Sequence, residues 1–102
     1  MSEKAYEIIE LAKRSGKIRK GTNEVTKALE RGKAKLVVVA EDVSPKEITM
    51  HLPLLAKEKG IKCVIVPSKT ELGVAAGMPI ATVAVAVVDE GEGKEQLKEL
   101  LA

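Results

Sequence analysis

The chain has 102 residues, of which 45% are hydrophobic and 31% are charged. This composition is typical of a folded globular domain and argues against a disordered tail, so we expect residues 1–102 to form a single domain. The formal net charge is only +2, from 17 basic and 15 acidic residues. A nucleic-acid-binding protein with this charge must gather its basic residues on one face.

Several reactive or base-stacking residue types are scarce. Tyr6 is the only aromatic residue, which excludes a module that stacks unpaired bases on several aromatic rings. Cys63 is the only cysteine and lies in an apolar run, which predicts a buried, reduced thiol. With His51 as the only histidine, we expect no Cys/His metal site, no catalytic triad and no cofactor. No signal or membrane-spanning run is present, so we expect a cytoplasmic protein.

The first part of the chain predicts a helix, a short strand and a second helix. Apolar residues at helical spacing predict a helix over residues 3–14, ended by Ser15-Gly16. Ile18, with basic neighbours, predicts an edge strand. Thr22 is the expected N-cap of the second helix, whose apolar face ends before Gly32.

The rest of the chain alternates apolar strands with capped helices. Ser44-Pro45-Lys46-Glu47 and Ser68-Lys69-Thr70-Glu71 each have the capping-box pattern that opens a helix. We expect strands over residues 36–40, 61–66 and 82–88, and helices over residues 45–59, 69–76 and 93–101. This alternation predicts an α/β fold, a single-domain three-layer α/β/α sandwich with a mostly parallel, mixed central sheet.

The start of the second helix combines polar groups of several kinds. Asn23, Lys27 and Arg31 lie four residues apart and so share a helix face, with Glu24 beside them. An amide, a carboxylate and cations can together read a base edge against a phosphate background. The simpler interpretation is a solvated helix start in which Glu24 complements the helix dipole, and spacing alone favours it.

Beyond spacing, the run Lys20-Gly21-Thr22-Asn23-Glu24-Val25-Thr26-Lys27 resembles the signature of the archaeal ribosomal protein family usually written L-seven-Ae. The resemblance covers nearly the whole chain in one register, and it favours a functional Asn23–Glu24 pair over a merely solvated one. It continues through Glu30-Arg31-Gly32, Ala34-Lys35-Leu36-Val37, Ala40-Glu41-Asp42-Val43, His51-Leu52-Pro53-Leu54-Leu55, Val66-Pro67-Ser68-Lys69 and Glu71-Leu72-Gly73.

The resemblance implies an RNA-binding structural protein that is not an enzyme. Members of this family bind kink-turn RNA, a sharply bent internal loop with sheared G·A pairs and an extruded nucleotide. The partners that the resemblance implies for this chain are ribosomal RNA, box C/D and H/ACA guide RNAs and ribonucleoprotein scaffold proteins. The free chain is expected to be a monomer. The implied roles are guanine contacts from Asn23 and Glu24, backbone or base-edge contacts from Lys20, Lys27, Arg31 and Lys69, and close approach at Gly21 and Thr22.

The family pattern also assigns the loop before the last strand, here Met78-Pro79-Ile80, to covering the extruded nucleotide. Archaeal members often have Ile-Glu-Val in this place, and the proline here lacks a backbone amide donor. The two apolar flanks remain available for RNA. The alternative interpretation is that Met78 and Ile80 only seal the edge of the core.

Two further expectations concern charge. Lys17, Arg19, Lys20, Lys27, Arg31 and Lys69 are expected to line one RNA-facing surface. The acidic pair Glu41-Asp42 follows a predicted parallel strand, which raises the alternative of a small Mg²⁺-dependent α/β enzyme or signalling domain. Asp89-Glu90 is the only other acidic pair that could complete such a site, and a turn in which Asp42 bonds nearby backbone is the simpler interpretation.

Overall fold

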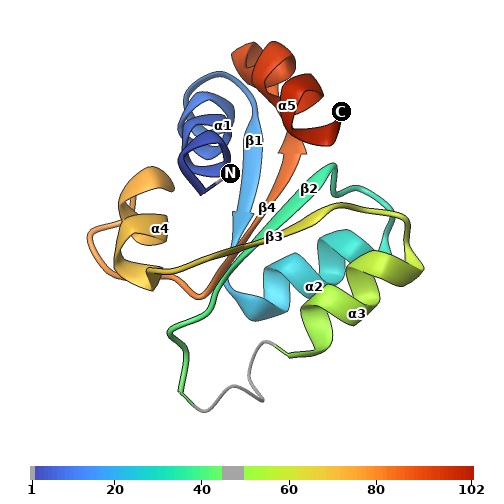
Figure 1. Ribbon diagram of the computed structural model, residues 1–102, viewed down its shortest axis with the longest axis vertical. Coiled ribbons are helices and arrows are strands. Elements are labelled where there is room, and N and C mark those ends of the chain that lie inside the picture. The colour runs from blue at the N-terminus through green and yellow to red at the C-terminus, as the bar shows by residue number, and fades with distance from the viewer. Residues whose placement is uncertain (1, 45–49) are drawn as a thin grey trace.

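The computed structural model describes residues 2–44 and 50–102, which form a four-stranded sheet with helices on both faces (Figure 1). No helix within those residues is long and apolar enough to cross a membrane. The elements in chain order are α1 (Ser2–Ser15), β1 (Lys17–Lys20), α2 (Thr22–Glu30), β2 (Leu36–Ala40), α3 (His51–Glu58), β3 (Cys63–Val66), α4 (Lys69–Ala75), β4 (Ala84–Asp89), the 3₁₀ turn η2 (Gly91–Gly93) and α5 (Lys94–Leu101).

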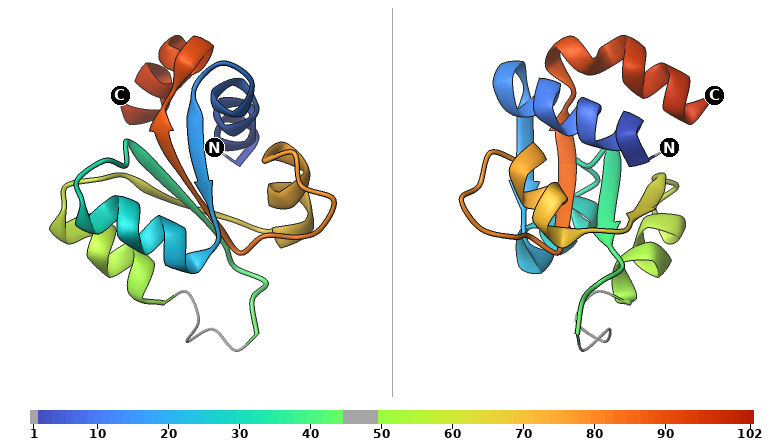
Figure 2. Two further views of the ribbon diagram at one scale, coloured as in Figure 1. Left: turned by 180° about the vertical axis from the view of Figure 1, so that it is seen from behind. Right: turned by 60° about the vertical axis from the view of Figure 1, so that its left-hand side comes forward.

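The helices form two layers, one on each side of the sheet. α1, α4 and α5 cover one face, and α2 and α3 cover the other (Figures 1 and 2). All five residues of β2 are buried, as expected for a strand covered on both sides. The predicted three-layer α/β/α sandwich is therefore confirmed.

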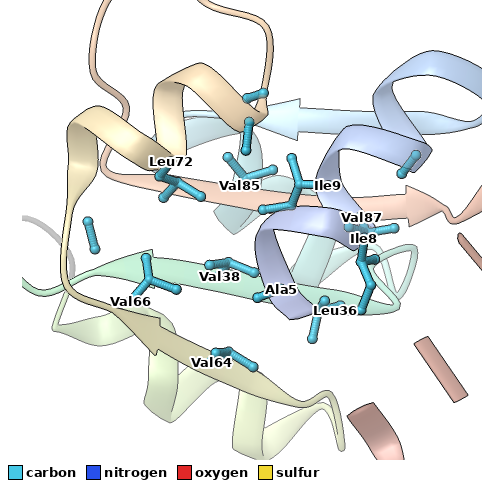
Figure 3. Close-up of a cluster of buried hydrophobic side chains, with 14 of the residues drawn as sticks. Ala5, Ile8, Ile9, Leu36, Val38, Val64, Val66, Leu72, Val85 and Val87 are labelled. Atoms are coloured by element: carbon cyan, nitrogen blue, oxygen red, sulfur yellow. The ribbon is translucent and has the colours of Figure 1, made fainter. Parts of the chain in front are cut away.

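The core consists of two clusters separated by the sheet. Because side chains alternate along a strand, Leu36, Val38 and Ala40 pack beneath α1 and α4, while Val37 and Val39 pack beneath α2 and α3. Figure 3 shows the first cluster, in which Ile8 and Ile9 of α1 lie over the strands. Both layers are thus held by buried aliphatic side chains, with no Phe or Trp in the sequence.

The sheet is mixed, as predicted, but it is not mostly parallel. The strand order is β1-β4-β2-β3. Only β2 and β3 run parallel, with Val38 opposite Val64, whereas β4 is antiparallel to both β1 and β2. The expectation of a mostly parallel sheet is wrong because β4 enters the sheet at the end where β3 finishes.

The reversal before β4 comes from a loop that folds back along α4. The amide of Met78 donates to Gly73 O over 2.9 Å, and the amide of Thr82 returns to Lys69 O at the helix start, 3.2 Å away. The loop therefore returns the chain to the start of α4, so β4 begins at the end of the sheet where β3 finished. Gly73 permits this path, since a Cβ there would collide with the carbonyl oxygen of Ile80.

Most predicted elements lie within two residues of their predicted bounds. β1 is an edge strand, as expected, and α2 and α3 end just before Gly32 and Gly60. The strands predicted over residues 61–66 and 82–88 each begin two residues late, at Cys63 and Ala84. The capping box predicted at residues 44–47 lies largely outside the described residues, and α3 begins at His51.

Candidate nucleic-acid interface

Backbone hydrogen bonds gather several predicted site segments at one end of the sheet. At this end β1 leads into α2, β2 finishes, and β3 leads into α4, while β4 begins (Figure 1). Four bonds tie these segments together: Gly21 N to Ala84 O (2.9 Å), Ala40 N to Val83 O (2.9 Å), Glu41 N to Val66 O (2.8 Å) and Thr82 N to Lys69 O (3.2 Å). Residues far apart in the sequence therefore share one surface.

Gly21, and not Thr22, is the N-cap of α2. Its φ of 91° and ψ of 155° turn the chain from β1 into the helix, a conformation that favours glycine. The prediction of Thr22 as the cap is wrong because β1 continues through Lys20 and leaves Gly21 as the only non-helical residue between strand and helix. Gly21 offers no side chain to cap α2, and no side-chain cap is found within residues 2–44 and 50–102, so the first backbone N–H groups of the helix can donate to another acceptor.

The first turn of α2 presents its polar side chains to solvent. Asn23 and Glu24 are exposed, whereas Val25 is fully buried beneath the helix. The hydroxyl of Thr22 is buried and has no hydrogen-bond partner among the described residues. Thr26 donates to Thr22 O over 2.7 Å and lies 3.0 Å from His51 Nε2, which ties α2 to the start of α3. The amide and carboxylate therefore stand on a helix that the core and α3 hold in place.

A small cavity of about 60 Å³ lies between α2 and strands β1 and β4 and is lined by residues of both charges. Lys27 Nζ lies 3.6 Å from Glu24 Oε2, so a cation stands beside the carboxylate. Lys33 was not singled out from the sequence as a site residue, because only the turn after α2 brings it here. The lining residues are Arg19, Glu24, Lys27, Ala28, Arg31, Lys33 and Val88.

The six cations expected on one surface do not share one face. Arg19 lies opposite Ala86, which packs on the α2 side of the sheet, while Lys20 lies opposite Val85, which packs on the α1 side. The strand alternation therefore wraps the cationic surface around the free edge of β1. Lys17 lies opposite Asp89 at the far end of β1, away from the start of α2.

Lys69 is placed by the cap of α4. Ser68 is the N-cap, and its Oγ accepts a hydrogen bond from the amide of Glu71 over 3.1 Å, as the capping-box pattern predicts. The Lys69 amide donates to Asp42 Oδ1 over 2.8 Å. The half-buried Lys69 therefore stands at the same end of the sheet as the start of α2, on the side covered by α4.

The loop Met78-Pro79-Ile80 divides into one packed and two exposed residues. Met78 is half-buried and packs against the cluster beneath α1 and α4. Pro79 is exposed, and Ile80 is 68% exposed although it is a large aliphatic residue. The core-sealing interpretation therefore holds for Met78 only, and Ile80 remains available for a ligand.

The acidic pairs that suggested a magnesium site lie at opposite ends of the sheet. Asp42 accepts the Lys69 amide, as the simpler interpretation predicts, and Glu41 is exposed. Because β4 runs antiparallel to β2, Asp89 and Glu90 leave the sheet at the other end. Within residues 2–44 and 50–102 no three His, Cys, Asp or Glu side chains are grouped to hold a metal ion.

Cys63 is only half-buried in β3, less than its apolar neighbours predict. Burial nevertheless raises the pKa of its thiol to about 11, so the neutral form dominates at physiological pH. His51 is exposed and its imidazole stands beside Thr26, which gives it a structural role at the α2–α3 contact.

These observations define a class of protein: a small α/β/α sandwich in which an uncapped helix start carries an amide, a carboxylate and flanking cations. The chain matches the model of the ribosomal protein L7Ae/L30e/S12e/Gadd45 family over residues 3–97, and it belongs to that family. Among solved structures it is similar to the 15.5 kD RNA binding protein of Giardia lamblia. That likeness has a TM-score of 0.84 and 32% sequence identity, and it covers 99% of this chain and 87% of the other.

Proposed function

We propose that this chain binds kink-turn RNA through the start of α2 and acts as a structural ribonucleoprotein component, not as an enzyme. Two comparisons support RNA binding: the family match over residues 3–97 and the similarity to an RNA-binding protein of Giardia lamblia. Kink-turn recognition rests on the resemblance of the run Lys20 to Lys27 to the family signature.

The observation that carries the proposal is the geometry of the first turn of α2. Gly21 has no side chain to hold RNA away, and its Cβ position faces open space. Asn23 and Glu24 follow it on the exposed side of a helix whose amides lack a cap. Sheared G·A pairs display guanine donors that Watson–Crick pairing would hide, and a carboxylate accepts such donors. Glu24 and Asn23 are therefore suited to read that edge.

Cations near Glu24 reduce the electrostatic repulsion that a carboxylate would otherwise have with RNA phosphates. Lys27 stands 3.6 Å from one carboxylate oxygen, and Arg19 and Arg31 line the same cavity. The positive charge offsets repulsion between Glu24 and phosphates, while the second carboxylate oxygen can still accept a hydrogen bond. Lys20, Lys27 and Lys69 near the helix start, and Arg31 at the other end of α2, then neutralise RNA phosphates.

The exposed side chain of Ile80 supports a contact with the extruded nucleotide. An aliphatic residue that is 68% exposed gains free energy when an unstacked base covers it. Pro79 beside it offers no amide donor, so the contact is apolar and tolerates different bases. Met78 supports the loop from below through its core contact.

The proposed RNA targets are ribosomal RNA and box C/D and H/ACA guide RNAs of the archaeal type. The proposed location of the protein is the cytoplasm. Scaffold proteins of guide-RNA particles are the proposed protein partners. Chemistry in such particles would belong to those partners, because this chain contributes recognition and bending of the RNA.

A gel-shift titration of the unmodified protein tests the proposal. One RNA carries a kink turn, and its control has the two G·A pairs replaced by Watson–Crick pairs in the same stem. We expect the control to bind at least about a hundredfold more weakly, since it removes at least two base-edge contacts. Equal affinity for the two RNAs would show that the protein reads charge and not the kink turn.

A further inference from the structure

A second surface lies at the end of the sheet opposite the start of α2. A groove of about 410 Å³ runs between α5 and the segments that lead into β2 and β3. Figure 1 shows α5 at this end, beside the beginnings of β2 and β3. The residues that line the groove are Ala34, Lys35, Ile61, Glu90, Lys94, Leu97, Lys98 and Leu101.

The floor of the groove is aliphatic. Leu97 is buried in the core beneath α1, and Leu101, one helical turn further along the same face, is 51% exposed. Ala34 and the half-buried Ile61 complete the floor from the sheet side. Phosphate gains nothing from such a floor, whereas aliphatic side chains of a protein partner would bury it.

The charge around the groove is positive. Lys35 Nζ lies 2.7 Å from Glu90 Oε1, and this hydrogen bond lowers the pKa of Glu90, with the charge of Lys94 adding to the effect. Glu90 is the only carboxylate lining the groove among the described residues, and Lys35 already balances it. Lys94 and Lys98 lie four residues apart on α5, and neither takes part in the ion pairs found between described residues.

We propose that this groove binds an acidic amphipathic segment of a partner protein, with aliphatic residues on the floor and carboxylates facing Lys94 and Lys98. The groove goes beyond the proposed RNA binding and does not depend on it. The five residues of β2 separate the two surfaces by about 16 Å at about 3.3 Å a residue, so both can be occupied together. The chain would thus join an RNA to an acidic protein segment.

The test uses two fluorescein-labelled helical peptides with the full chain. Both carry leucines at alternating three- and four-residue spacing, one with glutamates and the other with lysines at the flanking positions. Fluorescence anisotropy at physiological salt should show the acidic peptide binding about tenfold or more tightly than the basic one. Equal affinities would overturn the proposal.

Variants locate the binding site. Leu101→Ser and Lys98→Glu should each weaken acidic-peptide binding about fivefold or more, because the first removes an apolar contact and the second reverses a charge that attracts the peptide. Val74→Ser and Lys57→Glu are matched controls on α4 and α3, at residues that are also exposed, and should bind like the parent. Leu101 is half-exposed at the end of α5, so the variant should keep its unfolding midpoint. Unchanged binding by both groove variants would contradict the proposal.

Three further measurements separate this proposal from its competitors. Asn23→Ala should bind the acidic peptide like the parent, which keeps failure of RNA recognition distinct from failure of the groove. Plain duplex RNA should not displace the peptide, and displacement would assign the groove to phosphate instead. The protein alone should sediment as a monomer, and self-association abolished by Leu101→Ser would show that a second copy fills the groove.

Discussion

Single residues of one loop carry different tasks, because Met78 supports the core while the neighbouring Ile80 faces solvent. The family pattern predicts that both flanks cover the extruded nucleotide, and only burial separates them. Thr22 shows the same difficulty: serine and threonine are favoured caps, yet the conformation of Gly21 decides where α2 begins. The sequence suggests candidate residues for this site, but it does not show which of them are already packed in the core.

Ile80→Ser should weaken kink-turn binding about three- to tenfold while leaving the unfolding midpoint unchanged, because its side chain is 68% exposed. Met78→Ser should instead lower stability, by about 1–3 kcal/mol, through lost core contacts. Gel shifts and urea unfolding on the same preparations measure both effects. Val74→Ser, at a 70% exposed aliphatic residue outside the loop, is the control. RNA affinity unchanged by Ile80→Ser would remove this loop from the interface.

The thiol of Cys63 should react slowly in the native protein. Burial raises its pKa from 9.0 to about 11, so at pH 8 the native chain holds about a hundredfold less thiolate than an exposed cysteine. Reaction with a disulfide reagent should therefore be at least about tenfold slower in native buffer than in concentrated urea. Equal rates in the two conditions would mean that Cys63 is more accessible than the structure shows.

At the scale of elements, the bounds of helices and strands follow from local patterns, but the direction of β4 does not. Apolar runs and capping residues predict β2, β3 and the α4 cap within a residue or two. The return of the loop along α4 depends on a contact between Gly73 and the backbone of Ile80 and Ala81. No spacing rule reveals that contact, so alternating helices and strands predicted parallel pairing where antiparallel pairing occurs.

Gly73→Ala tests that contact. Helix propensity alone predicts that alanine stabilises α4 by about 1 kcal/mol. The structure predicts the opposite sign, a loss of about 1–3 kcal/mol, because the new Cβ meets the Ile80 carbonyl oxygen and lies 3.0 Å from the Ala81 Cα. Urea unfolding measures the difference, with Val74→Ala on the exposed side of α4 as control. A variant as stable as the parent would show that the loop does not depend on this close approach.

At the scale of the whole molecule, the low net charge of +2 conceals local clusters of basic residues. Lys20, Lys27 and Lys69 lie near the start of α2, and Arg19 lines the same cavity as Lys27, whereas Arg31 is the C-cap of α2 and Lys17 lies at the far end of β1. These basic residues could be identified from the sequence. Their division between the two faces of β1 required the register of that strand against β4.

Salt dependence measures how much the basic residues near the start of α2 contribute to RNA binding. The logarithm of the kink-turn association constant should fall linearly with the logarithm of salt concentration, because lysine and arginine side chains that contact phosphates release counterions from the RNA. Lys20→Gln should reduce the slope by about one, the loss of one phosphate contact. Lys17→Gln, on the same strand but at the opposite end of the sheet, should leave the slope unchanged. Equal effects of the two substitutions would contradict the position of the interface.

We propose that Glu24 contacts the RNA bases directly and is not merely tolerated beside the RNA. In a purely charge-driven binder, removal of a carboxylate from a surface lined by Arg19, Lys27 and Arg31 would strengthen binding. If Glu24 accepts hydrogen bonds from a guanine edge, Glu24→Gln keeps the size of the side chain but loses acceptor capacity and the charge assistance. Lost base-edge contacts cost about 1–3 kcal/mol.

A gel-shift titration of Glu24→Gln on kink-turn RNA and on plain duplex RNA is the most direct measurement of that claim. We predict that the variant binds the kink turn at least about tenfold more weakly than the parent, equivalent to about 1.4 kcal/mol. Its weak binding to the duplex should stay nearly unchanged, since Lys20, Lys27 and Arg31 remain in place. Asn23→Ala should show the same pattern. Kink-turn affinity equal to or above that of the parent in Glu24→Gln would contradict the account.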